Sequence, residues 1–94
     1  MDYQAAEGGE KVRDQAYAES VDCCLDQVTN DDFVGVQMYT RHTYGPDGII
    51  KPKADDPNML VMGYEYYPES LENVVRYVSS KIKTPIMITE NGIG

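Results

Sequence analysis

The sequence predicts an α/β fold built around a βαβ unit, and three observations indicate it. Apolar runs at 32–40 and 86–89 are typical of buried strands, and a helical apolar stripe lies between them, beginning near Pro68. A strand, a crossover helix and a second strand require a parallel pair with a right-handed connection. Because two parallel strands cannot bury both of their faces alone, we interpret residues 1–94 as a single segment of a larger α/β sheet.

The N-terminal part of the chain combines a polar stretch with a helix. Residues 1–9 are polar and end in a glycine pair, so we expect a disordered lead-in. From Glu10 to Val28, apolar residues recur at spacings of three and four, as they do on one face of a helix. Residues 29–31, Thr-Asn-Asp, supply the turn that ends this helix.

The first strand is expected at 32–40, where two alternating sets of side chains are both largely apolar. Gly35 in its middle predicts either the close approach of another backbone or a tight barrel interior. Residues 41–63 contain a Gly-Pro-Asp-Gly turn and two further prolines. They therefore predict a long connection without a helix or a central strand.

The crossover helix is predicted from Pro68 to Lys83. Proline fits the first helical turn because its missing N–H would have no partner there. The apolar stripe of this helix consists of Leu71, Val74, Val75, Val78 and Ile82. The Thr84-Pro85 pair ends the helix, a short buried strand follows, and Glu90 stands at the C-terminal end of that strand.

Composition excludes several classes of partner. The formal net charge is −8, and the acidic residues are concentrated in the first third of the chain. An acidic surface repels phosphate groups and anionic lipids, so we expect no nucleic-acid partner and no membrane partner.

The adjacent Cys23 and Cys24 indicate reduced thiols. With no apolar leader and no long apolar run, the sequence favours a cytoplasmic location.

Glu90 is the first candidate for chemistry. Parallel α/β folds place their active sites where strands end, and a carboxylate there can act as a nucleophile or as a general acid/base. Tyr39 also lies near the end of its strand, and its hydroxyl could orient Glu90 through a hydrogen bond. On the pattern alone, Glu90 as a solvated turn residue and Tyr39 as a packed aromatic residue are the favoured interpretations. The neighbouring Arg41 and His42 gain no role from spacing.

Three motifs then indicate a family. The end of the chain, PIMITENGIG at 85–94, resembles the strand-end motif of glycoside hydrolase family 1, in which an I/V-T-E-N-G stretch carries the nucleophilic glutamate. DFVGVQMYTR at 32–41 is similar to the D-F-I/V-G-I/V-N-Y-Y-T stretch of that family. GYEYYPESLENVVRYV at 63–78 resembles its G-W-E-x-Y-P-x-G-L segment. The motifs occur in the order of the family and span roughly residues 32–94.

The resemblance implies a partial (β/α)₈ barrel, to which this chain contributes about the sixth and seventh strands. It also implies hydrolysis of β-glycosides by a retaining double displacement, with Glu90 as nucleophile and Tyr39 orienting it. The substrate would be a β-glycoside, and no metal or organic cofactor is implied, because the reaction runs on two carboxylates. The second carboxylate of the family lies in an N-E-P motif that this sequence does not contain, so we expect the chain alone to be inactive.

Some positions depart from the family pattern. Gln37 stands where Asn is frequent, Met38 where a tyrosine is frequent, and Tyr64 where Trp is frequent. We expect Met38 to face the surrounding helices. The alternative hypothesis is a small non-catalytic βαβ protein, or the complementing half of a split barrel, which acts by association with itself or with another barrel fragment.

Overall fold

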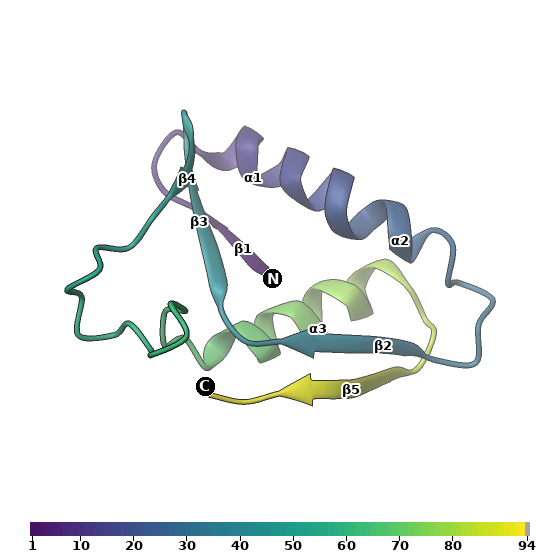
Figure 1. Ribbon diagram of the computed structural model, residues 1–94. Helices are drawn as coiled ribbons and strands as arrows, with labels where there is room; N and C mark the ends of the chain where they lie inside the picture. The colour runs from purple at the N-terminus through teal and green to yellow at the C-terminus, as the bar shows by residue number, and fades with distance from the viewer. Residues whose placement is uncertain (94) are drawn as a thin grey trace.

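Two parallel strands and the helix that connects them form the centre of the computed structural model, which describes residues 1–93 (Figure 1). The strands are β2 (Val34–Met38) and β5 (Ile86–Asn91), and the helix is α3 (Glu69–Lys81). β2 pairs with β5 in a parallel two-stranded sheet. The predicted βαβ unit is therefore confirmed.

The register of this sheet is not uniform. Val36 pairs with Ile88, but the next pair is Gln37 with Glu90, so the register shifts by one residue between Val36 and Gln37. Gly35 lies opposite Met87. A β-carbon on Gly35 would meet the methyl group of Thr89 at 3.1 Å, so a side chain, and not the expected backbone, makes the close approach.

The core lies between this sheet and α3. It consists of Leu25, Val36, Met38, Val74, Val78 and Ile82. Met38 is only 2% exposed, which confirms the expectation that it faces the helices. The predicted apolar stripe of α3 thus supplies the buried face, although Leu71 and Val75 are only half-buried. Glu69 and Glu72 lie in the first turn, where the helix dipole favours negative charge.

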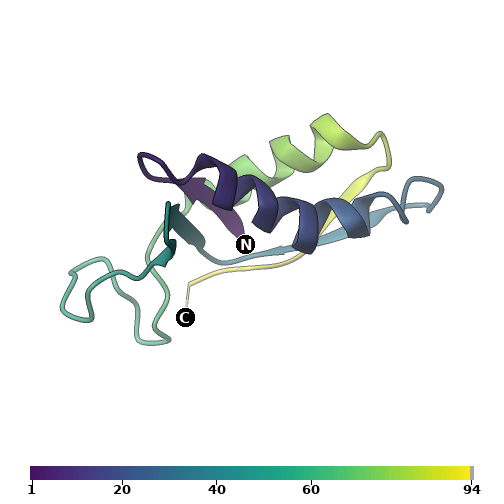
Figure 2. The ribbon, with the colours of Figure 1, turned by 90° about the horizontal axis from the view of Figure 1, so that it is seen from above.

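The predicted N-terminal helix is interrupted. It consists of α1 (Glu10–Tyr17), a π-helical turn η1 (Ala18–Asp22) and the short α2 (Cys23–Leu25). Figures 1 and 2 show this helical path running beside α3. Both cysteines are exposed free thiols. Within residues 1–93, no helix is long and apolar enough to cross a membrane.

A second sheet corrects two expectations from the sequence. Its strands are β1 (Asp2–Ala5), β3 (Arg41–Gly45) and β4 (Gly48–Ile50), in the order β1-β3-β4. β1 is parallel to β3, and β3 is antiparallel to β4. The prediction of a disordered lead-in at 1–9 was therefore wrong, because the backbone of Asp2–Ala5 pairs with β3.

The prediction of a long connection at 41–63 was also wrong for its first part. The Gly-Pro-Asp-Gly sequence does form a turn, but the turn closes the hairpin of β3 and β4. Gly48 has a φ of 122°, which glycine adopts readily because it has no β-carbon. The later part of the connection contains only an isolated bridge between Met59 and Glu65.

Gly9 joins the second sheet to α1. A β-carbon at this position would lie 1.9 Å from the carbonyl oxygen of Tyr44. No side chain can occupy that space, since the obstructing atom belongs to the backbone. Gly9 therefore allows the start of α1 to pack directly against β3.

Candidate active site

Tyr39 and Glu90 meet at the C-terminal edge of the parallel sheet. Tyr39 directly follows β2, and Glu90 lies near the end of β5. The hydroxyl group of Tyr39 donates a hydrogen bond to Oε2 of Glu90. The structure thus brings together the two residues that the sequence analysis selected, although their roles stay predictions.

Two further hydrogen bonds fix the strand ends against each other. The side-chain amide of Asn91 donates to the carbonyl oxygen of Met38 at 2.6 Å. The hydroxyl of Thr89 donates to the carbonyl oxygen of Val36 at 3.3 Å. Both neighbours of Glu90 are therefore tied to β2, which limits where the Glu90 carboxylate can lie.

The carboxylate changes the acid–base behaviour of the tyrosine. The hydrogen bond to Glu90, and to a smaller extent burial, raises the pKa of the Tyr39 phenol above its ordinary value of 10.0. The phenol is therefore protonated at neutral pH and can donate to a carboxylate. Tyr39 is 38% exposed, so the pair is open to molecules in solution.

An aromatic ring and a cavity adjoin this pair. Tyr64 stacks on Tyr39, with ring centroids 6.4 Å apart and an angle of 19° between the planes. A cavity of about 340 Å³ is lined by Tyr39, Met62, Tyr64, Gly92 and Ile93. Aromatic rings beside a carboxylate are a surface on which a small polar molecule with an apolar face can lie.

The residues that follow Tyr39 contact a distant segment. Arg41 donates two hydrogen bonds to the carboxylate of Glu65, at 3.0 and 2.7 Å. The hydroxyl of Thr40 donates to the backbone oxygen of Glu65 at 2.8 Å. The guanidinium carbon of Arg41 lies 3.9 Å from the centre of the Tyr67 ring. Sequence reasoning missed Glu65, since 24 residues separate it from Arg41 and no periodic pattern links them.

His42 does not join the site. His42 lies in β3 and stacks on Tyr3 at 6.3 Å. Burial and the nearby amino terminus lower the pKa of His42, which favours the neutral form. Residues 1–93 contain no group of three His, Cys, Asp or Glu side chains that could hold a metal ion.

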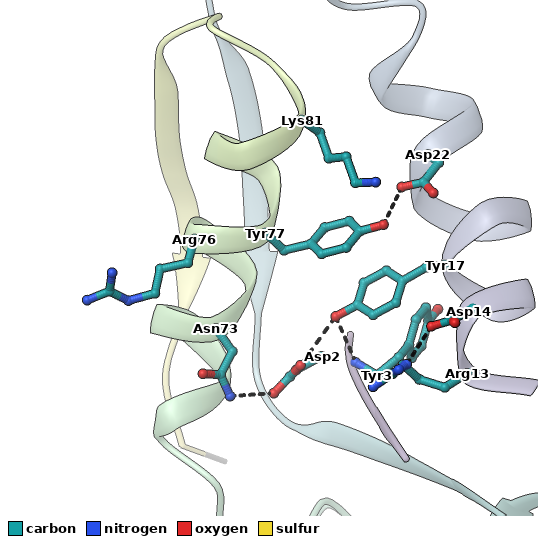
Figure 3. Close-up of a pocket in the computed structure, with 10 residues that line it drawn as sticks. All are labelled: Asp2, Tyr3, Arg13, Asp14, Tyr17, Asp22, Asn73, Arg76, Tyr77 and Lys81. Carbon is teal, nitrogen blue, oxygen red and sulfur yellow. Dashed lines mark hydrogen bonds and ion pairs between the residues drawn. The ribbon is translucent and has the colours of Figure 1, made fainter. Parts of the chain in front are cut away.

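A cavity of about 580 Å³ lies elsewhere, between α1 and α3 (Figure 3). Its polar side chains mostly bond to one another: Tyr77 donates to Asp22 at 2.6 Å, and Asn73 donates to Asp2 at 2.9 Å. Tyr17 stacks on Tyr77 at 4.1 Å across it. Asn73 thus joins α3 to β1, and the other two contacts join α3 to the N-terminal helical segment, so we assign all three a structural role.

Solved structures of two β-glycosidases are similar to this chain. The first is a beta-glycosidase, BGL167, with 39% sequence identity and a TM-score of 0.85 over 98% of this chain. The second is the apo structure of a beta-glucosidase, 1317, with 31% identity and a TM-score of 0.76, also over 98% of this chain. No protein-family model matches the chain. No curated protein matches it.

These similarities define the class of fold. The chain spans 22% of the length of each of the two structures. It is a small α/β fold with two sheets, similar to one part of a β-glycosidase.

Proposed function

We propose that this chain carries the nucleophile side of a retaining β-glycosidase active site, on two neighbouring strands of a (β/α)₈ barrel of glycoside hydrolase family 1. One observation carries the proposal: the Tyr39 hydroxyl donates to the Glu90 carboxylate where β2 and β5 end. Barrel enzymes place their catalytic groups at this end of the strands. The similarity of the chain to part of two β-glycosidase structures supports the proposal.

In the proposed reaction, Glu90 attacks the anomeric carbon of a β-glycoside, and the bond to the leaving oxygen breaks. A general acid gives that oxygen a proton. Water then gives a proton back to that same group, now acting as a base, and displaces Glu90 from the glycosyl-enzyme, so the product keeps its β-configuration. Tyr39 holds one carboxylate oxygen through its hydrogen bond, which directs the other oxygen toward the sugar.

The reaction needs a second carboxyl group, about 5–5.5 Å from the nucleophile. Glu65 does not suit this role, because Arg41 engages both of its oxygens. The N-E-P motif is not part of this sequence. We therefore propose that turnover requires a complementing part of the barrel that supplies the acid/base.

A chimera tests this function directly. The matched segment of the beta-glycosidase BGL167 is replaced by this chain, and hydrolysis of a nitrophenyl β-glycoside is measured. We expect activity, with formation of a covalent adduct on Glu90 when an activated 2-deoxy-2-fluoro glycoside is added. Glu90→Gln should abolish both, whereas Glu72→Gln, on the exposed surface of α3, should not.

Two results would contradict the proposal. A folded chimera that keeps its activity after Glu90→Gln would show that another group is the nucleophile. The isolated 94-residue chain should not be labelled by the same reagent, so stoichiometric labelling of Glu90 in it would contradict the need for a complementing segment.

A second candidate is a small non-catalytic protein that acts by association. It is favoured by apolar side chains on the β2–β5 sheet and beside it: Phe33 and Met87 are each 50% exposed. Sedimentation equilibrium from low to high micromolar concentration tests it, and a mass that stays monomeric would argue against it. The DNA on both sides of the coding sequence separates the candidates further, since an upstream N-E-P codon stretch supports the glycosidase.

A further inference from the structure

Tyr39 lies between two anchored residues. Met38 and Thr40 are each 2% exposed, so the backbone on both sides of Tyr39 is buried. Tyr39 itself is 38% exposed. An exposed ring with two free torsions does not keep one orientation by itself. Its orientation toward Glu90 must therefore come from other contacts.

Those contacts come from the segment that leads into α3. Residues 39–41 lie against residues 64–67: Tyr64 stacks on Tyr39, and both Thr40 and Arg41 bind Glu65. The same carboxylate receives two hydrogen bonds from one guanidinium group, which is the strongest geometry for an ion pair.

The burial of this ion pair sets it apart. The side chains of Arg41 and Glu65 are 28% and 18% exposed. By contrast, Arg76 and Glu72 form an ion pair whose side chains are 76% and 66% exposed. Exposed pairs add little order, whereas a partly buried bidentate pair restrains both side chains.

We propose that the ion pair between Arg41 and Glu65 positions Tyr39 for its contact with Glu90. It does so by holding Tyr64 against the Tyr39 ring, with the Thr40 hydroxyl as a second attachment. We refer to Arg41, Glu65 and the Thr40 hydroxyl as the clamp. Arg41 and Glu65 are then positioning residues, and their role rests on the proposed function of Glu90.

The 94-residue chain tests this clamp by NMR. Tyrosines are labelled with ¹³C at the phenol carbon, and the Tyr39 signal is assigned with Tyr39→Phe. In the unchanged chain, we expect its pKa above 10.0 and a cross-relaxation signal between the Tyr39 and Tyr64 rings. In Glu65→Gln, the pKa should fall toward 10.0 and the ring–ring signal should weaken.

Control variants show whether the change at Tyr39 comes from the loss of the ion pair between Arg41 and Glu65. Glu72→Gln breaks the exposed pair on α3 and should change neither measurement. The charge-exchanged variant with Arg41→Glu and Glu65→Arg should recover part of the raised pKa of Tyr39. If the phenol signals of distant tyrosines also change in Glu65→Gln, that substitution has disturbed the whole fold. Arg41→Lys is then the deciding variant, because it keeps the positive charge but loses the bidentate hydrogen bonds to Glu65.

The outcomes separate the clamp from the function. An unchanged pKa of Tyr39 and an unchanged ring–ring signal, in Glu65→Gln or in the deciding Arg41→Lys, overturn the clamp. If Glu90→Gln lowers the pKa of Tyr39 and the clamp variants do not, the clamp alone is rejected. If Glu90→Gln leaves that pKa unchanged, the contact between Tyr39 and Glu90 is absent, and the proposed function fails with it.

Discussion

Val78→Ala is expected to destabilise the chain by about 2 kcal/mol. Val78 is 3% exposed and belongs to the core between α3 and the β2–β5 sheet. Removal of two methyl groups loses about 1.6 kcal/mol, at about 0.8 kcal/mol per carbon. A cavity of roughly 40 Å³ adds about 1 kcal/mol, at about 24 cal/mol per Å³. The higher helix propensity of alanine returns about 0.5 kcal/mol.

This loss is measurable by urea unfolding, followed by circular dichroism at one fixed chain concentration. The midpoint should fall while the slope of the free energy with urea stays the same. The matched control is Val61→Ala, since Val61 is fully exposed, and it should change the free energy by less than about 0.5 kcal/mol. Equal effects of the two substitutions would refute the assignment of this core.

Three further predictions follow from single contacts. Burial and the hydrogen bond to Asp22 raise the pKa of Tyr77 above 10.0, so its contribution to stability is complete below pH 10 and is lost as the pH rises further. Unfolding free energies measured from pH 8 to 11.5 should therefore fall less steeply in Tyr77→Phe than in the unchanged chain. Gly9→Ala should cost about 2 kcal/mol or more in the same urea assay, because its β-carbon collides with the Tyr44 carbonyl; a cost below about 0.5 kcal/mol would contradict this packing. Thr84→Val should cost about 1 kcal/mol, since the buried hydroxyl donates to two carbonyl oxygens near the end of the N-terminal helical segment, and a neutral result would show that water replaces those bonds.

The βαβ unit could be predicted from the sequence because its signals are local. Apolar periodicity over a few residues defines β2, α3 and β5, and the parallel arrangement follows from the length of the crossover. The meeting of Tyr39 and Glu90 follows in turn, since neighbouring parallel strands end at the same edge.

The second sheet could not be predicted in the same way. β1 is polar, and its partner β3 lies 39 residues further along the chain, so neither strand shows its pairing in its own composition. The contact between Arg41 and Glu65 is equally non-local. Many acidic residues in the sequence could pair with Arg41, and only the path of the folded backbone determines that Glu65 does.

The irregular register of the parallel sheet determines which way the β5 side chains point. Paired residues on neighbouring strands direct their side chains to the same face, and successive residues alternate. Val36 faces the core, so its partner Ile88 belongs to that side. Gln37 therefore belongs to the opposite side, and the shift gives it Glu90 as partner.

In an unbroken ladder, Glu90 would instead pair with Met38 and turn toward the apolar core. The one unmatched residue, Thr89, reverses this parity and puts the carboxylate on the face that Tyr39 shares. The register of β5, more than the type of residue at each position, therefore determines the face on which the Glu90 carboxylate lies. A change that restored the regular register without altering the length of β5 would therefore turn the Glu90 carboxylate toward the apolar core, although every side chain of the site would still be present.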